Sequence, residues 1–164
     1  MITDKFELRE DTPVVAFIGV GSNLGDSEAF VRAGINELRR SKGITLLDTS
    51  PFFRSKPFQA SGEDYINAVI KIKSLLNPDD LLSTLQFIEN QNGRKRSTLN
   101  APRTLDLDLI FFGHSQIDSP RLKIPHPRWR ERAFVLLPLH CIAPEWVSDE
   151  MLKNVQNQEI VQVE

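Results

Sequence analysis

The sequence contains a single cysteine, Cys141, among its 164 residues. A disulfide within the chain is therefore excluded, and so are a cysteine-rich zinc site and a redox pair of cysteines. Long apolar runs are also absent, because no stretch approaches the roughly 20 apolar residues that a membrane-spanning helix needs. Residues 1–13 are charged and lack the apolar core of a signal peptide. These absences predict a protein of the cytoplasm, a reducing compartment.

A strong excess of charge of either sign is missing as well, since the formal net charge is only −2. The charges are unevenly distributed along the chain. Residues 94–132 contain nine Lys and Arg residues against four Asp and Glu residues, a local balance of +5, whereas the remainder carries −7. A nucleic-acid-binding domain is expected to be basic throughout. The pattern therefore argues against nucleic acid and favours a small anionic ligand such as a polyphosphate.

Internal repeats, low-complexity tracts and linkers are absent too, and the hydrophobic content of 40% can supply one sizeable core. Hydrophobic spacing predicts strands and amphipathic helices in the order βαββαβ. The strands are expected over 14–20, 44–53, 65–75 and 105–112, and the helices over 27–42 and 77–93. This order matches an α+β, ferredoxin-like sandwich, a mainly antiparallel sheet with helices packed on it, here on one face. Prolines between 120 and 144 predict short elements and turns rather than long helices in the last part of the chain.

Asp106 and Asp108 interrupt the apolar run at 105–112. Residues two apart lie on the same face of a strand, so both carboxylates are expected side by side, with the leucines between them on the other face. On a half-buried sheet face they would repel each other and lose hydration unless a cation compensates. Mg2+ takes one or two carboxylates together with substrate phosphates, and Arg103 offers a phosphate-binding fork. A salt-bridge network with arginines, without a metal, is the alternative.

Residues 21–25, Gly-Ser-Asn-Leu-Gly, follow the first expected strand and suit a tight turn. The segment lacks the Gly-Lys-Ser/Thr ending of a P-loop and the glycine spacing of a dinucleotide-binding fingerprint. We interpret it as a structural turn near the site, with backbone contact to a ligand as the alternative.

Several rarer motifs occur in a fixed order along the chain. They are Gly21-Ser22-Asn23-Leu24-Gly25, Phe53-Arg54-Ser55, Tyr65-Ile66-Asn67-Ala68, Ile88-Glu89, Gly93-Arg94-Lys95-Arg96, Pro102-Arg103-Thr104-Leu105-Asp106-Leu107-Asp108, Ile124-Pro125-His126-Pro127, Arg132 and Phe134. In this combination the chain resembles the 6-hydroxymethyl-7,8-dihydropterin pyrophosphokinases, folate-pathway enzymes that transfer pyrophosphate from ATP to a pterin alcohol and share the ferredoxin-like fold. The resemblance implies one pyrophosphokinase domain over 1–164, with its core at 14–146 and terminal extensions at 1–13 and 149–164.

The resemblance also implies how the phosphates are held. Asp106 and Asp108 match the ligands of two Mg2+ ions, which straddle the ATP phosphates while the pterin hydroxyl attacks the β-phosphorus and expels AMP. The positions implied for ATP are Gln86, Glu89, Arg94, Arg96, Arg103, Ile110, His126 and Arg132. Arg94, Arg96 and Arg103 are implied, with the two aspartates, to act in catalysis, because arginine donates two hydrogen bonds to one phosphate and stays charged.

Five of these positions have a structural alternative when they are considered without the motifs. Arg94 and Arg96 would be a solvated pair of cations at a helix end. His126 would be a structural histidine flanked by prolines. Gln86 and Glu89, three apart on a helix, would be part of a solvent-facing polar stripe.

A pterin has hydrogen-bonding groups along its edge and aromatic faces, so its pocket needs amide-like groups and flat apolar walls. Asn67 can donate and accept from one side chain. The resemblance implies a pterin pocket with Phe134 as a stacking wall, formed by Ser55, Lys56, Phe58, Tyr65, Asn67 and Phe134. Tyr65 or Phe134 alone would be taken for ordinary core aromatics.

The chain departs from the family pattern mainly at residues 97–101. Leu99 and Asn100 stand near positions where some members have an arginine and a tryptophan, and Ala101 replaces a glycine. The family's tryptophan lid and loop arginine therefore have no counterpart there. Lys56 stands where several relatives have proline.

Two other classes of function remain to be separated from a pyrophosphokinase. A binding module without catalysis would keep Asn67 and the arginines but would not need paired aspartates. A regulatory ferredoxin-like domain would explain the fold but not the cluster of basic and acidic residues. The expected ligands are ATP, the pterin and Mg2+, with no nucleic acid, membrane or obligate protein partner.

Overall fold

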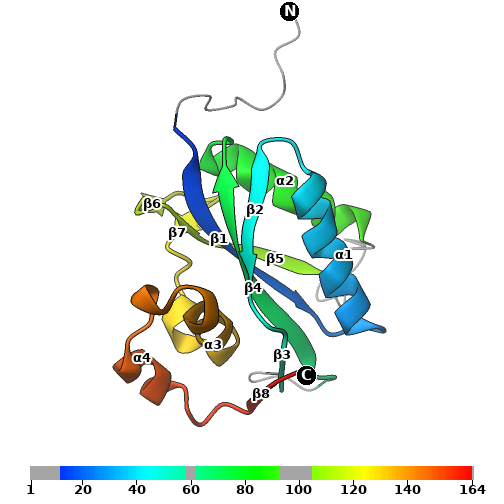
Figure 1. Cartoon of the computed structure of the whole chain (residues 1–164), viewed down its shortest axis with the longest axis vertical. Helices are drawn as coiled ribbons and strands as arrows, with labels where there is room; N and C mark the ends of the chain where they lie inside the picture. The colour runs from blue at the N-terminus through cyan, green and yellow to red at the C-terminus, as the bar shows by residue number, and fades with distance from the viewer. Residues whose placement is uncertain (1–11, 58–61, 93–104, 164) are drawn as a thin grey trace, which may run out of the picture.

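The computed structural model describes residues 12–57, 62–92 and 105–163 (Figure 1). The first elements are β1 (Val14–Ser22), α1 (Ser27–Arg40), β2 (Ile44–Thr49), β3 (Phe53–Ser55), β4 (Tyr65–Ser74), α2 (Pro78–Gln91) and β5 (Asp106–Phe112). They are followed by β6 (Ile117–Asp118), β7 (Lys123–Ile124), α3 (Ala133–Ile142), α4 (Asp149–Asn154) and β8 (Ile160–Gln162), with 3-10 turns at Trp129–Glu131 and Pro144–Trp146. Among the described helices, none is long and apolar enough to cross a membrane.

The two helices of the first half, α1 and α2, begin at side-chain caps. The Asp26 carboxylate accepts the N–H of Ala29 at 3.2 Å, and the Asn77 side chain accepts the N–H of Asp80 at 2.8 Å. These caps satisfy donors that have no partner within the first helical turn. Pro78 fits the first turn of α2 because its missing N–H would have had no intrahelical acceptor there.

The main sheet has the strand order β5-β1-β4-β3-β8. β2 also pairs with β4, along residues 70–74, whereas β3 pairs with residues 65–67. All of its pairings are antiparallel. The first part of the chain has the order βαβββαβ, in which β2 and β3 together take the place of the second strand of a βαββαβ unit, so this arrangement confirms the expected ferredoxin-like class. The single strand expected over 44–53 is wrong, because β2 and β3 are separate. Pro51 lies between them, and a proline has no N–H to donate to a sheet.

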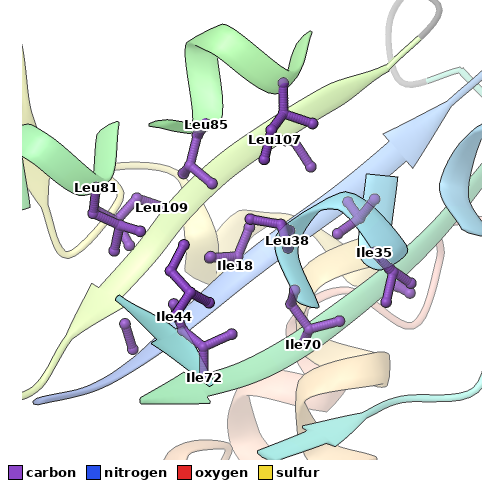
Figure 2. Packing of buried hydrophobic residues seen from close by; sticks show 14 of the residues in the cluster. Ile18, Ile35, Leu38, Ile44, Ile70, Ile72, Leu81, Leu85, Leu107 and Leu109 are labelled. Atoms are coloured by element: carbon purple, nitrogen blue, oxygen red, sulfur yellow. The ribbon is translucent and has the colours of Figure 1, made fainter. Parts of the chain in front are cut away.

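One face of the sheet is covered by α1 and α2 (Figure 1). Ile18 of β1 packs there against a core to which Ile35 and Leu38 of α1 and Leu81 and Leu85 of α2 belong (Figure 2). The leucines of β5 belong to the same core. Their alternation with the two aspartates is therefore as expected.

The opposite face is covered by α3, so the expectation that helices cover only one face is wrong. Phe17 of β1 and Val69 of β4 belong to a second core with Leu136 and Leu139 of α3. The structure also gives this part of the chain a longer helix than its prolines indicate. Pro138 lies inside α3, where it removes one helical hydrogen bond, but both leucines are fully buried and their packing offsets that loss.

Candidate active site

A cavity of about 340 Å³ lies on the α3 side of the sheet, between β1, β3, β4, β5 and the first turn of α3. It contains ten of the residues that the sequence assigns to ligands: Ser55, Lys56, Tyr65, Asn67, Asp106, Asp108, Ile110, His126, Arg132 and Phe134. These residues come from segments far apart in the chain. The structure therefore brings most of the expected site together in one place.

Glycines form the floor of the cavity. Gly21 pairs with Asn67 of β4 on one side and with Asp106 of β5 on the other, and Gly19 pairs with Asp108. The missing side chains leave open space between the carboxylates and the amide. Two strand spacings separate the backbones of Asp106 and Asn67, about 10 Å. The cavity can therefore hold one chemical group at the aspartates and another at the asparagine.

Gly21 lies inside β1, which continues to Ser22. Our interpretation of this residue as part of a turn is therefore wrong; the turn follows, with Gly25 at φ +56°. A Cβ at position 21 would lie 2.9 Å from Oδ1 of Asn67. A strand glycine often marks such a close approach, and here it lines the cavity.

The carboxylate end of the cavity is formed by β5. Asp106 is half-buried and Asp108 is exposed, so the pair is more open than the half-buried strand face expected from sequence. A bulge follows, because Ile18 pairs with Leu109 and Phe17 with Phe111, which leaves Ile110 between two paired positions. Such a bulge re-aims a side chain, and Ile110 lines the cavity beside the carboxylates.

The donor set fits Mg2+ better than a metal that needs a full set of protein ligands. Within the described ranges, no group of three or more His, Cys, Asp or Glu side chains could hold a metal ion. Two carboxylates on one strand face match Mg2+, which takes few protein ligands and completes its shell with water and phosphate oxygens. Asp106 and Asp108 are the described residues that could hold it.

His126 and Arg132 face these carboxylates. Burial lowers the pKa of the His126 imidazole; Asp108 opposes this shift, and Arg132 and Arg128 add to it. Burial also lowers the pKa of the Arg132 guanidinium, and the negative charge of Asp108 again opposes the shift. Nδ1 of His126 accepts the N–H of Arg128 at 3.2 Å, so the proton of the neutral ring lies on Nε2. The ring can therefore donate one hydrogen bond without carrying charge.

The amide end of the cavity is formed by β3, β4 and α3. Asn67 is buried, and its Nδ2 donates to Oγ of Ser55 at 2.8 Å. This bond fixes the orientation of the amide. Phe134, in the first turn of α3, is half-buried, and the guanidinium of Arg132 lies 5.3 Å from the centre of its ring. The site thus combines a fixed amide with an aromatic wall that adjoins a cation.

Gln86 and Glu89 of α2 are not among the residues that line the cavity. Glu89 is buried, with 5% of its surface exposed, and its Oε2 accepts the N–H of Leu107 at 2.9 Å. Leu107 lies between the two aspartates, on the edge strand β5. The described contact of Glu89 therefore fixes the strand that carries the carboxylates. Its implied contact with ATP stays a prediction, as does that of Gln86.

Four expected site residues lie outside the described residues: Phe58, Arg94, Arg96 and Arg103. The departures at Leu99, Asn100 and Ala101 lie there as well.

Sequence reasoning did not identify several residues of the cavity wall. They are Gly19, Val20, Ala68, Arg128, Trp129 and Val135. Gly21 is predicted as part of a turn, with backbone contact to a ligand only as the alternative. Trp129 is buried and packs edge-on against Phe111 at 4.8 Å between ring centres. The two glycines in an otherwise β-branched and apolar strand were the available signal, because glycine weakens a strand unless something approaches it closely.

This arrangement defines a class of protein. A cavity with a carboxylate pair, a histidine and arginines at one end, and an amide with an aromatic wall at the other, suits an enzyme that positions an anionic phosphate compound beside a flat polar one.

The comparisons with known proteins agree with this class. The family model of 7,8-dihydro-6-hydroxymethylpterin-pyrophosphokinase matches residues 17–144. A 2-amino-4-hydroxy-6-hydroxymethyldihydropteridine pyrophosphokinase from Synechocystis is 42% identical over 140 residues, which cover 85% of this chain and 72% of the relative. The Bacillus subtilis protein of the same name is 37% identical over 150 residues, 91% of this chain and 89% of the relative. The chain therefore belongs to the 7,8-dihydro-6-hydroxymethylpterin-pyrophosphokinase family and is an enzyme of that type.

A solved structure supports the fold independently. The Plasmodium falciparum HPPK-DHPS structure superposes with a TM-score of 0.64 at 14% identity and covers 92% of this chain and 41% of that one. At this identity the likeness concerns the fold alone.

Proposed function

We propose that this chain binds ATP and 6-hydroxymethyl-7,8-dihydropterin at opposite ends of the cavity and transfers pyrophosphate to the pterin, a step in folate biosynthesis. One observation carries the proposal: the carboxylates of Asp106 and Asp108 and the Asn67–Ser55 pair line a single cavity, on either side of a glycine floor. The phosphates would lie at the carboxylates and the pterin at the amide. The hydroxymethyl group would then lie between the two ends, where Gly21 leaves space.

The pterin is recognised by Asn67, Ser55 and Phe134 in this proposal. Asn67 has both a donor and an acceptor, and its bond to Ser55 holds the amide in place before the ligand arrives. Phe134 offers a flat wall for the pterin ring, and Tyr65 and Lys56 complete the rim. A preformed amide loses little freedom when the pterin binds, so its hydrogen bonds contribute more fully to affinity.

Asp106 and Asp108 would hold Mg2+, and we propose two ions as the family resemblance implies. Bound there, the metal would neutralise charge on the phosphates and lower the pKa of the pterin hydroxyl. His126 and Arg132 lie at the same end of the cavity. The neutral imidazole can donate to a phosphate oxygen, and the guanidinium can bind one through two hydrogen bonds. Arg94, Arg96 and Arg103 are proposed for the same phosphates on the resemblance alone.

In the reaction, the hydroxyl oxygen forms a bond to the β-phosphorus of ATP. The bond from that phosphorus to the oxygen shared with the α-phosphate breaks, and its electron pair leaves with AMP. The hydroxyl proton passes to water. The residues of the chain contribute by holding both substrates in line and by offsetting negative charge, which is the usual basis of catalysis in phosphoryl transfer.

We propose that one domain carries out this activity. Its compartment would be the cytoplasm, where ATP is available and Cys141 stays reduced. No macromolecular partner is needed for it, because both substrates are small molecules.

Chromatography of the nucleotide products tests the proposal directly. With Mg2+, ATP and 6-hydroxymethyl-7,8-dihydropterin, the protein should release AMP only when the pterin is present, and EDTA should abolish the release. Pterin-dependent formation of ADP would overturn the reaction type, because an ordinary kinase transfers the γ-phosphoryl group. Tight Mg-dependent binding of both ligands without turnover would identify a binding module instead.

A further inference from the structure

The C-terminal segment 157–163 is bonded to both walls of the amide end of the cavity. It lies beyond residues 17–144, which the family model matches. Its strand β8 pairs with β3, with Ile160 opposite Ser55. Two further backbone bonds extend this pairing, from the N–H of Lys56 to the carbonyl of Glu159 at 3.2 Å and from the N–H of Val163 to the carbonyl of Phe52 at 2.8 Å. The segment therefore fixes the outer edge of β3, whose inner edge is bonded to β4.

The same segment holds the start of α3 through one side chain. Oε1 of Gln158 accepts the N–H of Ala133 at 3.0 Å, and Nε2 of Gln158 donates to the carbonyl of Glu131 at 2.8 Å. Both ends of the amide are thus bonded to backbone on either side of Arg132. The side chain of Gln158 connects the C-terminal segment to the turn that carries Arg132 and Phe134.

Gln158 caps the start of α3 from outside the helix. The N-cap residue of α3 is Arg132, and it makes no capping hydrogen bond. An arginine cannot accept a hydrogen bond, so the first N–H groups of α3 need an acceptor from elsewhere. Gln158 supplies it from outside the helix. Arg132 is thereby free to direct its guanidinium over the ring of Phe134 and into the cavity.

We propose that Gln158 is a positioning residue for pterin binding, which rests on the proposed function. Its amide sets the place of the first turn of α3, and β8 sets the place of β3, so that Phe134 and Ser55 stand at a fixed separation. Ser55 and Phe134 also line a second cavity of about 260 Å³, together with residues 157–160. Gln158 is not among the residues that line the main cavity, so it acts through the walls and not by touching the pterin.

The test compares Gln158→Ala with Gln156→Ala. Gln156 is exposed, is of the same residue type, and its side chain has no hydrogen bond among the described residues. In Gln158→Ala, we expect the KM for the pterin to rise about tenfold, because the loss of one or two hydrogen bonds lets Phe134 move away from its place. The KM for ATP should rise less, because only Arg132 of the ATP residues lies in the turn that Gln158 holds, whereas Asp106 and Asp108 lie on β5, with which β8 does not pair. Gln156→Ala should match the wild type.

Two further measurements separate positioning from a general loss of stability. In Gln158→Glu, the carboxylate can still accept the N–H of Ala133 but cannot donate to the carbonyl of Glu131, so only part of the pterin affinity should return. Hydrogen exchange of the Ala133 amide in the ligand-free protein should be about tenfold faster in Gln158→Ala than in the wild type, since the amide loses its acceptor.

Pterin KM within about twofold of wild type in Gln158→Ala, or an equal rise in both KM values, would overturn the proposal. Unchanged exchange at Ala133 would also overturn it, whatever the kinetics. Failure of the proposed function gives a different result, because the wild type itself would then release no AMP in response to the pterin.

Discussion

The glycine floor of the cavity leads to a prediction that uses two matched substitutions, Gly21→Ala and Gly19→Ala. Both glycines lie in β1 and both line the cavity. A Cβ at position 21 would lie 2.9 Å from Oδ1 of Asn67, closer than the two atoms can approach. A Cβ at position 19 would lie 3.4 Å from Cδ1 of Ile110, which is a tight but permitted contact. The same chemical change therefore meets a fixed polar group in one case and a flexible methyl group in the other.

The expected changes in stability follow from two opposing effects. Replacing a strand glycine by alanine stabilises the folded state by about 0.5–1 kcal/mol, because the unfolded chain loses freedom. Overpacking costs about 1–3 kcal/mol when neighbours must shift. Gly19→Ala should therefore leave the free energy of unfolding unchanged or slightly raised. Gly21→Ala should lower it by about 1–2 kcal/mol, measured by urea denaturation.

The effect on binding should be larger and specific to the pterin. To relieve the contact, Asn67 must move away from Gly21, which disturbs its 2.8 Å bond to Ser55. Two misplaced hydrogen bonds to the ligand correspond to a loss of about ten- to a hundredfold in affinity. Calorimetric titration of the pterin, with Mg2+ and an unhydrolysable ATP analogue present, measures it. Pterin affinity in Gly21→Ala equal to that of Gly19→Ala would refute the assignment of Asn67 to the pterin.

Three further predictions concern the carboxylate end. Glu89→Ala should lower the free energy of unfolding by about 1–3 kcal/mol, because the buried N–H of Leu107 loses its acceptor, and Glu89→Gln should lose less. Unchanged stability with a raised KM for ATP would instead make Glu89 a nucleotide contact. Asp106→Asn and Asp108→Asn should each reduce kcat by at least about a hundredfold without loss of stability in urea, and near-normal turnover in both would contradict the metal assignment. His126 has a lowered pKa in the folded protein, chiefly through burial, so its contribution to stability is complete above about pH 6.5 and is lost as the pH falls through the folded pKa. Urea denaturation without metal should therefore show a weaker loss of stability on acidification in His126→Gln than in the wild type. An equal dependence of the free energy of unfolding on pH in the two proteins would contradict the lowered pKa of His126.

The carboxylate strand could be predicted from the sequence because its information is local. Asp106 and Asp108 alternate with leucines, and the period of a strand assigns the two sets to opposite faces without knowledge of the partners. The structure confirms that assignment, since the leucines are in the core and the aspartates line the cavity. Periodicity could not show that Asp108 is exposed, because exposure depends on which other segments lie over that face.

The second helical layer was missed although the sequence held a signal for it. Residues 14–20 are apolar at every position except the single glycine, and a strand that is apolar on both sides is typical of a sheet covered on both faces. A strand covered on one face would alternate, as β4 does in part. The prolines near α3 obscured the signal, since Pro138 inside a helix is normally unfavourable and is tolerated here only because that helix is packed against the sheet.

The C-terminal segment shows a different limit of sequence reasoning. Arg132 at the N-cap position of α3 breaks a local rule, because arginine cannot accept the hydrogen bonds that a helix start requires. Such a conflict between local preference and structure is typical of functional sites, where a residue is kept for its ligand and the missing interaction comes from elsewhere. The compensating acceptor, Gln158, is separated from Ala133 by 25 positions and lies in a polar segment with no distinctive pattern. The conflict and its solution both appear only in the folded chain, because the sequence does not predict where α3 begins and the position of the acceptor depends on β8 pairing with β3.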